Sequence, residues 1–151
     1  MGIQFNAANP NDWSLRTEIE EVDTSNANAR RILEATGLVT PLDPTGQIAV
    51  VEAEEWYRAH GESVPTSASL GIETEDELSG CVPAGFFREH ALLALAFEPE
   101  DEGIPWAADP QNSRWIECGR SPGLIQQRLE QLLALAEAAE KLGPDWCVCW
   151  G

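Results

Sequence analysis

The chain has 151 residues, of which 43% are hydrophobic and 23% are charged, fractions that are ordinary for one globular domain. It carries 26 Asp and Glu against 9 Lys and Arg, which gives a formal net charge of −17. Such a surface repels phosphate backbones and anionic membranes, so we expect neither direct nucleic-acid binding nor membrane binding.

The N-terminal third of the chain predicts two extended segments and a helix. Residues 3–6 form the first extended segment, and alternation along residues 13–22 predicts the second. Ser25 is a favourable N-cap for a helix that follows, and Gly37 suits the position just after its end.

A second helix is predicted after the Pro- and Gly-containing loop 41–46, and it ends at Gly61. Residues 62–80 are polar, acidic and rich in Ser, Thr and Gly, and they predict a long connection of the kind that is usually functional or mobile. The apolar face of this helix is expected to consist of Ala49, Ala53, Trp56, Tyr57 and His60.

The third predicted helix covers residues 83–97 and is apolar on all sides beyond Ala91, which is typical of a helix at the centre of a core. Prolines interrupt the chain after it, and residues 113–118 then predict a strand.

A fourth helix has the clearest signals. Ser121 is expected to cap it, Pro122 to occupy its first position and Gly143 to end it. A final strand is predicted over residues 146–150. These elements predict an α+β fold over residues 1–151, with about four helices packed on a small, mainly antiparallel sheet in a single domain.

Residues 1–6 lack the basic start and apolar run of a signal peptide, and the apolar stretch 91–97 is too short to span a bilayer. We therefore expect a cytoplasmic protein.

The four cysteines could form two disulfides or one metal site, but a cytoplasmic location favours reduced, buried thiols. They are Cys81, Cys118, Cys147 and Cys149. No metal and no cofactor is expected, because the usual zinc spacings are absent.

Several segments together are similar to a group of small uncharacterised proteins from bacterial and phage genomes. They are residues 25–30 leading to 37–38, residues 115–119, the leucine-rich fourth helix, and residues 150–151. The resemblance covers the two ends of the chain, leaves most of residues 41–110 unmatched, and implies a single-domain, phage-associated protein. It transfers no activity and no site residue.

Acidic residues are concentrated in the second quarter of the chain, where residues 41–80 contain 9 acids and 1 base. A second dense run follows the third helix, and Trp106 beside it could anchor an interface. These observations define the predicted partner-binding residues: Glu52, Glu55, Glu73, Glu75, Asp76, Glu77, Glu98, Glu100, Asp101, Glu102 and Trp106. The run 73–77 lacks the pattern of an EF-hand loop, so it is interpreted as a solvated charge run.

Two local patterns suggest a small-molecule site instead. Gly119, Arg120 and Ser121 precede a helix N-terminus, where backbone N–H groups and a guanidinium can bind an anion. Cys81 precedes the third helix and is a weak nucleophile candidate, since neither His60 nor His90 has a spacing that points to it.

The sequence therefore favours a protein that binds a basic surface of another protein without catalysis. In its sharpest form it imitates the charge of nucleic acid or acts as a phage-associated inhibitor. A small anion-binding domain or enzyme built on Arg120 is the alternative, and charge that serves only solubility is the third possibility.

Overall fold

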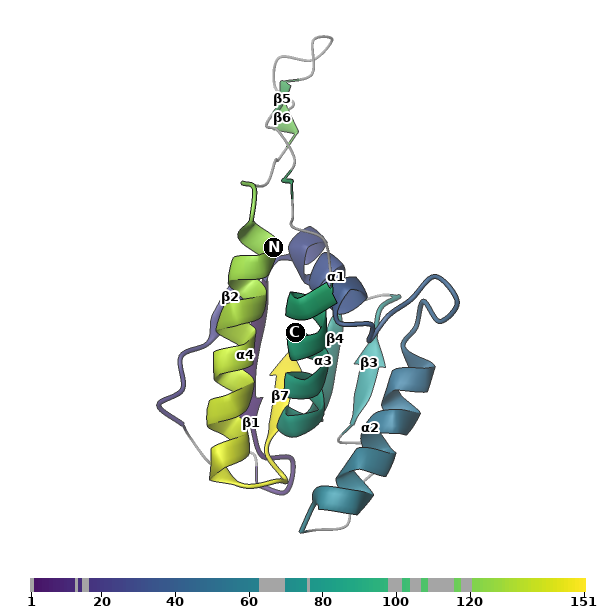
Figure 1. Ribbon diagram of the computed structural model, residues 1–151, viewed down its shortest axis with the longest axis vertical. Coiled ribbons are helices and arrows are strands. Elements are labelled where there is room, and N and C mark those ends of the chain that lie inside the picture. The colour runs from purple at the N-terminus through teal and green to yellow at the C-terminus, as the bar shows by residue number, and fades with distance from the viewer. Residues whose placement is uncertain are drawn as a thin grey trace.

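Five strands form one antiparallel sheet in the spatial order β2-β1-β7-β4-β3 (Figure 1). The computed structural model describes residues 2–12, 14, 17–62, 70–75, 77–97, 102–103, 107–108, 116–117 and 121–151. The strands of the sheet are β1 (Gly2–Ala8), β2 (Val22–Ser25), β3 (Gly71–Glu73), β4 (Ser79–Pro83) and β7 (Cys147–Trp150). The helices are α1 (Asn26–Ala35), α2 (Gln47–His60), α3 (Ala84–Phe97) and α4 (Leu124–Leu142). The predicted α+β arrangement is confirmed.

The C-terminal strand β7 lies in the middle of the sheet, between β1 and β4. Trp150 pairs with Phe5 on one side and with Gly80 on the other. Gln4 and Gly151 exchange both backbone hydrogen bonds, at 3.1 and 3.2 Å, so the two ends of the chain lie side by side. The strand predicted at residues 146–150 is confirmed, and the sheet cannot form without it.

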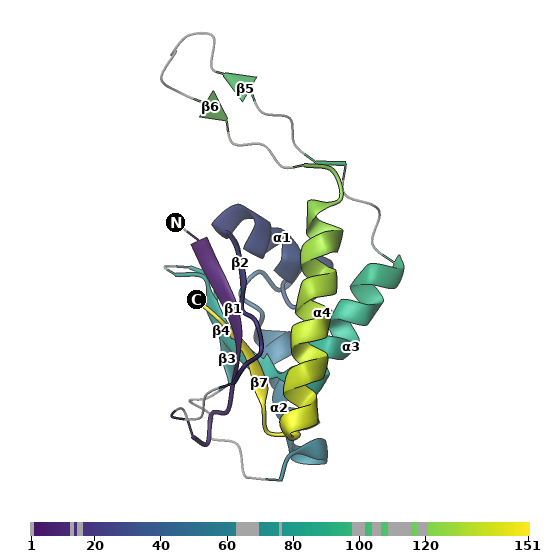
Figure 2. The same cartoon turned by 90° about the vertical axis from the view of Figure 1, so that its left-hand side faces the viewer.

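One face of the sheet packs against helices α1, α3 and α4, which lie together on that side (Figure 2). Side chains at alternating positions of the strands point into this layer, as the period of two requires. Phe5 and Trp150 lie 5.7 Å apart between ring centroids, and Phe87 of α3 is also in this cluster. Val82 and Val148 are fully buried beside them.

Helices α3 and α4 form the helix layer's main contact, held at one end by an ion pair between Arg88 Nε and Glu140 Oε2 at 2.6 Å. The outer side of α3 is not covered: 56% of Leu93 and 80% of Phe97 are exposed. The prediction that this helix lies at the centre of the core is therefore wrong, because α4 covers only one of its sides.

Helix α2 lies beside β3 and β4 at the edge of the sheet. The Asp43 carboxylate accepts hydrogen bonds from the backbone N–H groups of Gln47 and Ile48, at 3.1 and 2.8 Å, which caps the helix from the preceding loop. Tyr57 is buried in a small second cluster with Leu70, Cys81 and Cys147. By register, both cysteines belong to the face opposite the main core.

Two segments differ from their prediction. The second strand begins at Val22, and residues 17–21 form no strand, so the prediction of a strand at 13–22 is wrong for these residues, while residues 13, 15 and 16 lie outside the described part of the chain. The connection predicted at 62–80 contains the β3–β4 hairpin, in which only three residues of β3 pair. The paired stretch of β3 is too short for an alternating hydrophobic pattern to predict a strand.

The helix start predicted at Ser25 is confirmed, since the Ser25 hydroxyl accepts a hydrogen bond from the Asn28 N–H at 3.2 Å.

A separate two-stranded ladder joins β5 (Ala107–Ala108) and β6 (Ile116–Glu117). Both views show it beyond the end of α4 at which that helix begins (Figures 1 and 2). The strand predicted at 113–118 is present at Ile116–Glu117, and its other residues lie outside the described part of the chain.

A disulfide bond joins Cys81 of β4 to Cys149 of β7. These residues are directly opposite in the register, with their Cα atoms 4.1 Å apart. The pair exchanges no backbone hydrogen bonds, because Cys149 bonds to β1, and such pairs bring Cβ atoms closest. The predicted reduced state of this pair is wrong, since sequence spacing could not show that the two strands are neighbours.

The disulfide closes a loop between residues 68 apart in the sequence, so its removal should destabilise the fold. We expect Cys81→Ser with Cys149→Ser to lower the free energy of unfolding by about 2–4 kcal/mol, measured by urea denaturation. Cys118→Ser is the control variant. An unchanged midpoint in the double variant, with thiol titration showing no disulfide in the parent, would contradict the bond.

Gly80 of β4 provides a test of the packing around Trp150. A Cβ atom on Gly80 would overlap the indole ring of Trp150, whereas one on Gly71 of the neighbouring strand β3 would meet nothing within 4 Å. We expect Gly80→Ala to cost about 1–3 kcal/mol and Gly71→Ala to change stability little. Equal effects of the two variants in thermal and urea unfolding would disprove the packing described here.

Candidate functional site

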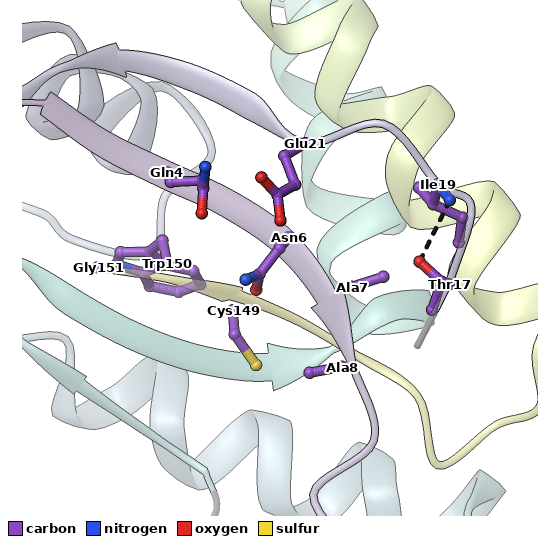
Figure 3. Close-up of a pocket in the computed structure, with 10 residues that line it drawn as sticks. All are labelled: Gln4, Asn6, Ala7, Ala8, Thr17, Ile19, Glu21, Cys149, Trp150 and Gly151. Atoms are coloured by element: carbon purple, nitrogen blue, oxygen red, sulfur yellow. Dashed lines mark hydrogen bonds between the residues drawn. The ribbon is translucent and has the colours of Figure 1, made fainter. Parts of the chain in front are cut away.

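A cavity of about 550 Å³ lies over β1 and the end of β7, on the side of the sheet away from the helix layer (Figure 3). Segment 17–21, which connects toward β2, forms its other wall. Its volume is within the range of ligand sites in proteins, roughly 300–1,000 Å³. The lining residues are Gln4, Asn6, Ala7, Ala8, Thr17, Ile19, Glu21, Cys149, Trp150 and Gly151.

The cavity exists because β2 is shorter than β1. Pairing between the two strands ends at Phe5 and Val22, although β1 continues to Ala8. Residues 17–21 form no strand, and Figure 3 shows them running away from β1. The second half of β1 therefore pairs with β7 on one edge, and on the other edge it pairs with no strand of the described residues.

The backbone of Ala7 points into this gap. Opposite residues in an antiparallel sheet alternate between pairs that exchange both hydrogen bonds and pairs that exchange none. Gln4 exchanges both with Gly151 on the β7 side, so Asn6 also faces β7, and Ala7 turns its N–H and C=O toward the β2 side. None of the backbone hydrogen bonds between described residues joins Ala7 to segment 17–21.

Polar side chains stand around the same gap. Gln4 donates from Nε2 to Asp23 Oδ1 at 3.2 Å. In Figure 3, Asn6 and Glu21 lie next to each other over β1. Neither of these two side chains has a hydrogen-bond partner among the described residues. The cavity thus offers a free amide, a free carboxylate and a free backbone edge, which suit a ligand with N–H donors or a positive charge.

Four exposed carboxylates lie along the segment that forms this wall and leads into β2, and we call them the cavity rim: Glu18, Glu20, Glu21 and Asp23. Of these, Glu21 lines the cavity itself. Segment 17–23 contains no Lys or Arg. Two ion pairs are found between described residues. Arg58 pairs with Glu54 on α2, and Arg88 of α3 pairs with Glu140 of α4. Neither pair involves a rim carboxylate, so neither neutralises the charge of the rim.

A second cavity of about 450 Å³ lies on the other side of the rim segment, against α4. Arg128 lines it together with Glu20 and Glu21. Its guanidinium donates from Nη1 to Gln131 Oε1 at 2.9 Å, and its Nε atom is buried without a partner in the described structure. One positive charge therefore lines this cavity together with three of the four rim carboxylates, Glu20, Glu21 and Asp23, which leaves the rim acidic.

The cysteines of β4 and β7 are not arranged for nucleophilic chemistry. Cys81 is joined to Cys149, so it presents no thiolate in this state. Burial, with a smaller contribution from Asp145, raises the pKa of the Cys147 thiol to about 12. Burial also raises the pKa of Tyr57, against the opposing effect of the Asn11 amide that donates to its hydroxyl at 3.1 Å.

The two histidines do not approach these cysteines through any contact in the described structure. His60 was expected to be buried on the apolar face of α2, which is wrong: it is exposed and stacked on Trp56, with ring centroids 4.2 Å apart. His90 pairs through Nδ1 with the Phe86 carbonyl oxygen at 2.9 Å. The Nδ1 atom of each histidine is thus hydrogen-bonded to a backbone carbonyl oxygen of its own helix.

The partner-binding residues predicted from sequence that the structure describes do not line the cavity. Glu52 and Glu55 are exposed on α2, where they flank a shallow apolar patch of Ile48 and Val51. Further predicted residues are exposed on or beside the β3–β4 hairpin and after α3: Glu73, Glu75, Glu77 and Glu102. The remaining ones lie outside the described residues: Asp76, Glu98, Glu100, Asp101 and Trp106.

The predicted anion site before α4 does not have its expected cap. The helix begins at Leu124, after Gly123 in a left-handed conformation (φ 78°), and no side chain caps it. The Ser121 backbone oxygen, rather than its hydroxyl, accepts the Leu124 N–H at 3.2 Å, because the Gly123 turn delays the start of the helix. Gly119 and Arg120 lie outside the described residues.

Sequence patterns alone do not reveal the cavity rim. Residues 18–21 contain three acids, the same density as residues 52–55, but the alternation along 13–22 predicts a strand there. Only the late start of β2, at Val22, makes the residues before it the wall of a cavity.

Comparisons with family models, characterised proteins and solved structures give no match. Among the described residues, no group of three or more His, Cys, Asp and Glu side chains is placed to hold a metal ion. In the same part of the chain, no helix is both long and apolar enough to cross a bilayer.

The environment of Cys147 predicts a difference in thiol reactivity after native reduction of the Cys81–Cys149 disulfide. With a pKa of about 12, Cys147 has only about one thiolate in ten thousand at pH 8, whereas Cys149 lines the cavity. In a Cys118→Ser background, we expect iodoacetamide to label Cys149 well before Cys147, as followed by peptide mass spectrometry. Both should react at similar rates in urea, and similar rates in the native state would contradict the burial.

Proposed function

We propose that this protein acts without catalysis, by binding a basic surface of another protein through the cavity rim. The observation that carries the proposal is the group of exposed rim carboxylates, which have no ion-paired cation among the described residues and lie beside a cavity whose Asn6 and Glu21 side chains have no partner there either. Burying these carboxylates in an interface is costly unless the partner brings positive charge. Complementary charge also speeds association, and this effect weakens in salt.

The acidic face predicted from sequence is the second place where such a partner could bind. Glu73, Glu75 and Glu77 are exposed near the β3–β4 turn. The rim is favoured because it adjoins a cavity and unpaired backbone, whereas the 550 Å³ cavity has no lining residue from the hairpin.

Charge removal at matched sites tests the proposal. One variant carries Glu18→Gln, Glu20→Gln and Glu21→Gln; the second carries Glu73→Gln, Glu75→Gln and Glu77→Gln. The control carries Glu34→Gln, Glu130→Gln and Glu137→Gln, which lie exposed on α1 and α4. All three variants lose three negative charges, so they differ only in where the charge is removed.

We expect the parent and the control to recover the same basic protein from a lysate of the source organism at low salt, quantified by mass spectrometry. The rim variant should recover at least about tenfold less, since close charge pairs at interfaces contribute about 1.5 kcal/mol or more. If only the hairpin variant recovered less of the partner, the binding site would be assigned to the β3–β4 hairpin. Equal losses in all three variants, or recovery that salt does not change, would indicate charge that serves only solubility.

Imitation of nucleic-acid charge is a narrower form of the same proposal. It requires the recovered partner to bind duplex DNA and to be displaced from this protein by that DNA. A partner without affinity for DNA would exclude this form and leave the broader one standing.

A further inference from the structure

We propose that the partner docks as an extended basic segment, which adds to the free edge of β1 at Ala7 and directs its cationic side chains to the cavity rim. This inference rests on the proposed function and specifies how the partner is recognised. It combines two independent features, an unpaired strand edge and an acidic wall facing it.

The unpaired edge supplies the backbone part of the recognition. Ala7 presents one N–H and one C=O toward the gap that β2 leaves when its pairing ends at Val22. An exposed strand edge of this kind is a template for another extended segment, which then gains main-chain hydrogen bonds. The pairing of β7 on the other edge keeps β1 extended without a ligand, so little ordering is needed on binding.

The acidic wall determines which extended segment fits. If β2 pairing continued, Glu20 would stand opposite Ala7 and Glu21 opposite Asn6, so an added segment would lie between β1 and these carboxylates. Alternate side chains of a strand point to the same face, which would bring every second residue toward Asn6 and Glu21. Lys or Arg at those positions would pair with the rim.

Charge argues against a second copy of this chain as the occupant. Two copies would each carry a net charge of −17, and segment 17–23 has no base to offer the rim of its neighbour. A basic segment from a different protein has the complementary charge.

The experiment uses the full chain with a defined probe, the peptide acetyl-Thr-Lys-Val-Arg-Thr-amide. Its Kd is measured by calorimetry, and its contacts are mapped by amide NMR. The main variant is Ala7→Pro, which removes the free N–H without breaking the pairing to β7, because Pro is tolerated where a strand's N–H faces an open edge. Ala7→Gly is the matched control, since it keeps the N–H.

We expect the Ala7 amide to shift on binding, and Ala7→Pro to weaken binding about fivefold or more, as loss of one hydrogen bond predicts. The Ala7→Gly variant should bind like the parent. N-methylation of the peptide's central Val gives a second measurement that does not depend on folding of the Pro variant, and it should weaken binding similarly.

Unchanged affinity on N-methylation and in a folded Ala7→Pro variant would overturn strand addition, while rim-dependent partner recovery could still support the proposed function. Equal binding of a peptide with Gln in place of Lys and Arg would overturn the basic character of the segment, and with it the proposed function. Slow hydrogen exchange of Ala7 without peptide would show that the edge is already paired. A dimer that Ala7→Pro disrupts would assign the edge to a second copy.

Discussion

The insertion of the C-terminal strand β7 between β1 and β4 is the constraint on which the rest of the structure depends. It joins the first residues of the chain to the middle of the chain, and Phe5, Val148 and Trp150 can bury one face only in this register. It also places Cys149 opposite Cys81, where the disulfide connects the two halves of the sheet. Because β7 is the last element of the chain and lies between β1 and β4, the sheet is held together by contacts between residues distant in sequence.

The same register creates the candidate site. Because β1 pairs with β7 along Phe5–Ala8, it stays extended beyond Phe5, where its pairing with β2 stops. One backbone edge therefore has no strand partner among the described residues at Ala7. Exposed edges are usually protected by charge or by short strands. Here a segment with four carboxylates lies opposite the edge. In the function that we propose, this one arrangement would both protect the edge and favour a basic chain as its partner.

Charge and structure make different contributions to the proposed function. The net charge of −17 is the reason for proposing a basic partner, but it gives no position, because acidic residues occur on α2, on the β3–β4 hairpin and along the rim. The cavity and the unpaired backbone give the position. Among the described residues, the thiol and imidazole groups are engaged by the disulfide, by burial or by hydrogen bonds within their own helices.

Local patterns in the sequence determined the α+β class, the start of α1 at Ser25, the end of α4 at Gly143 and the strand at the C-terminus, because caps, glycines and short-range periodicity act over a few residues. Only the tertiary structure decided the neighbours of each strand, and therefore the pairing of Cys81 with Cys149 and the short overlap of β2 with β1. It also decided that the side of α3 with Leu93 and Phe97 stays exposed and that residues 17–21 form a cavity wall. The physical reason is that these features depend on register between distant segments, which no local propensity encodes.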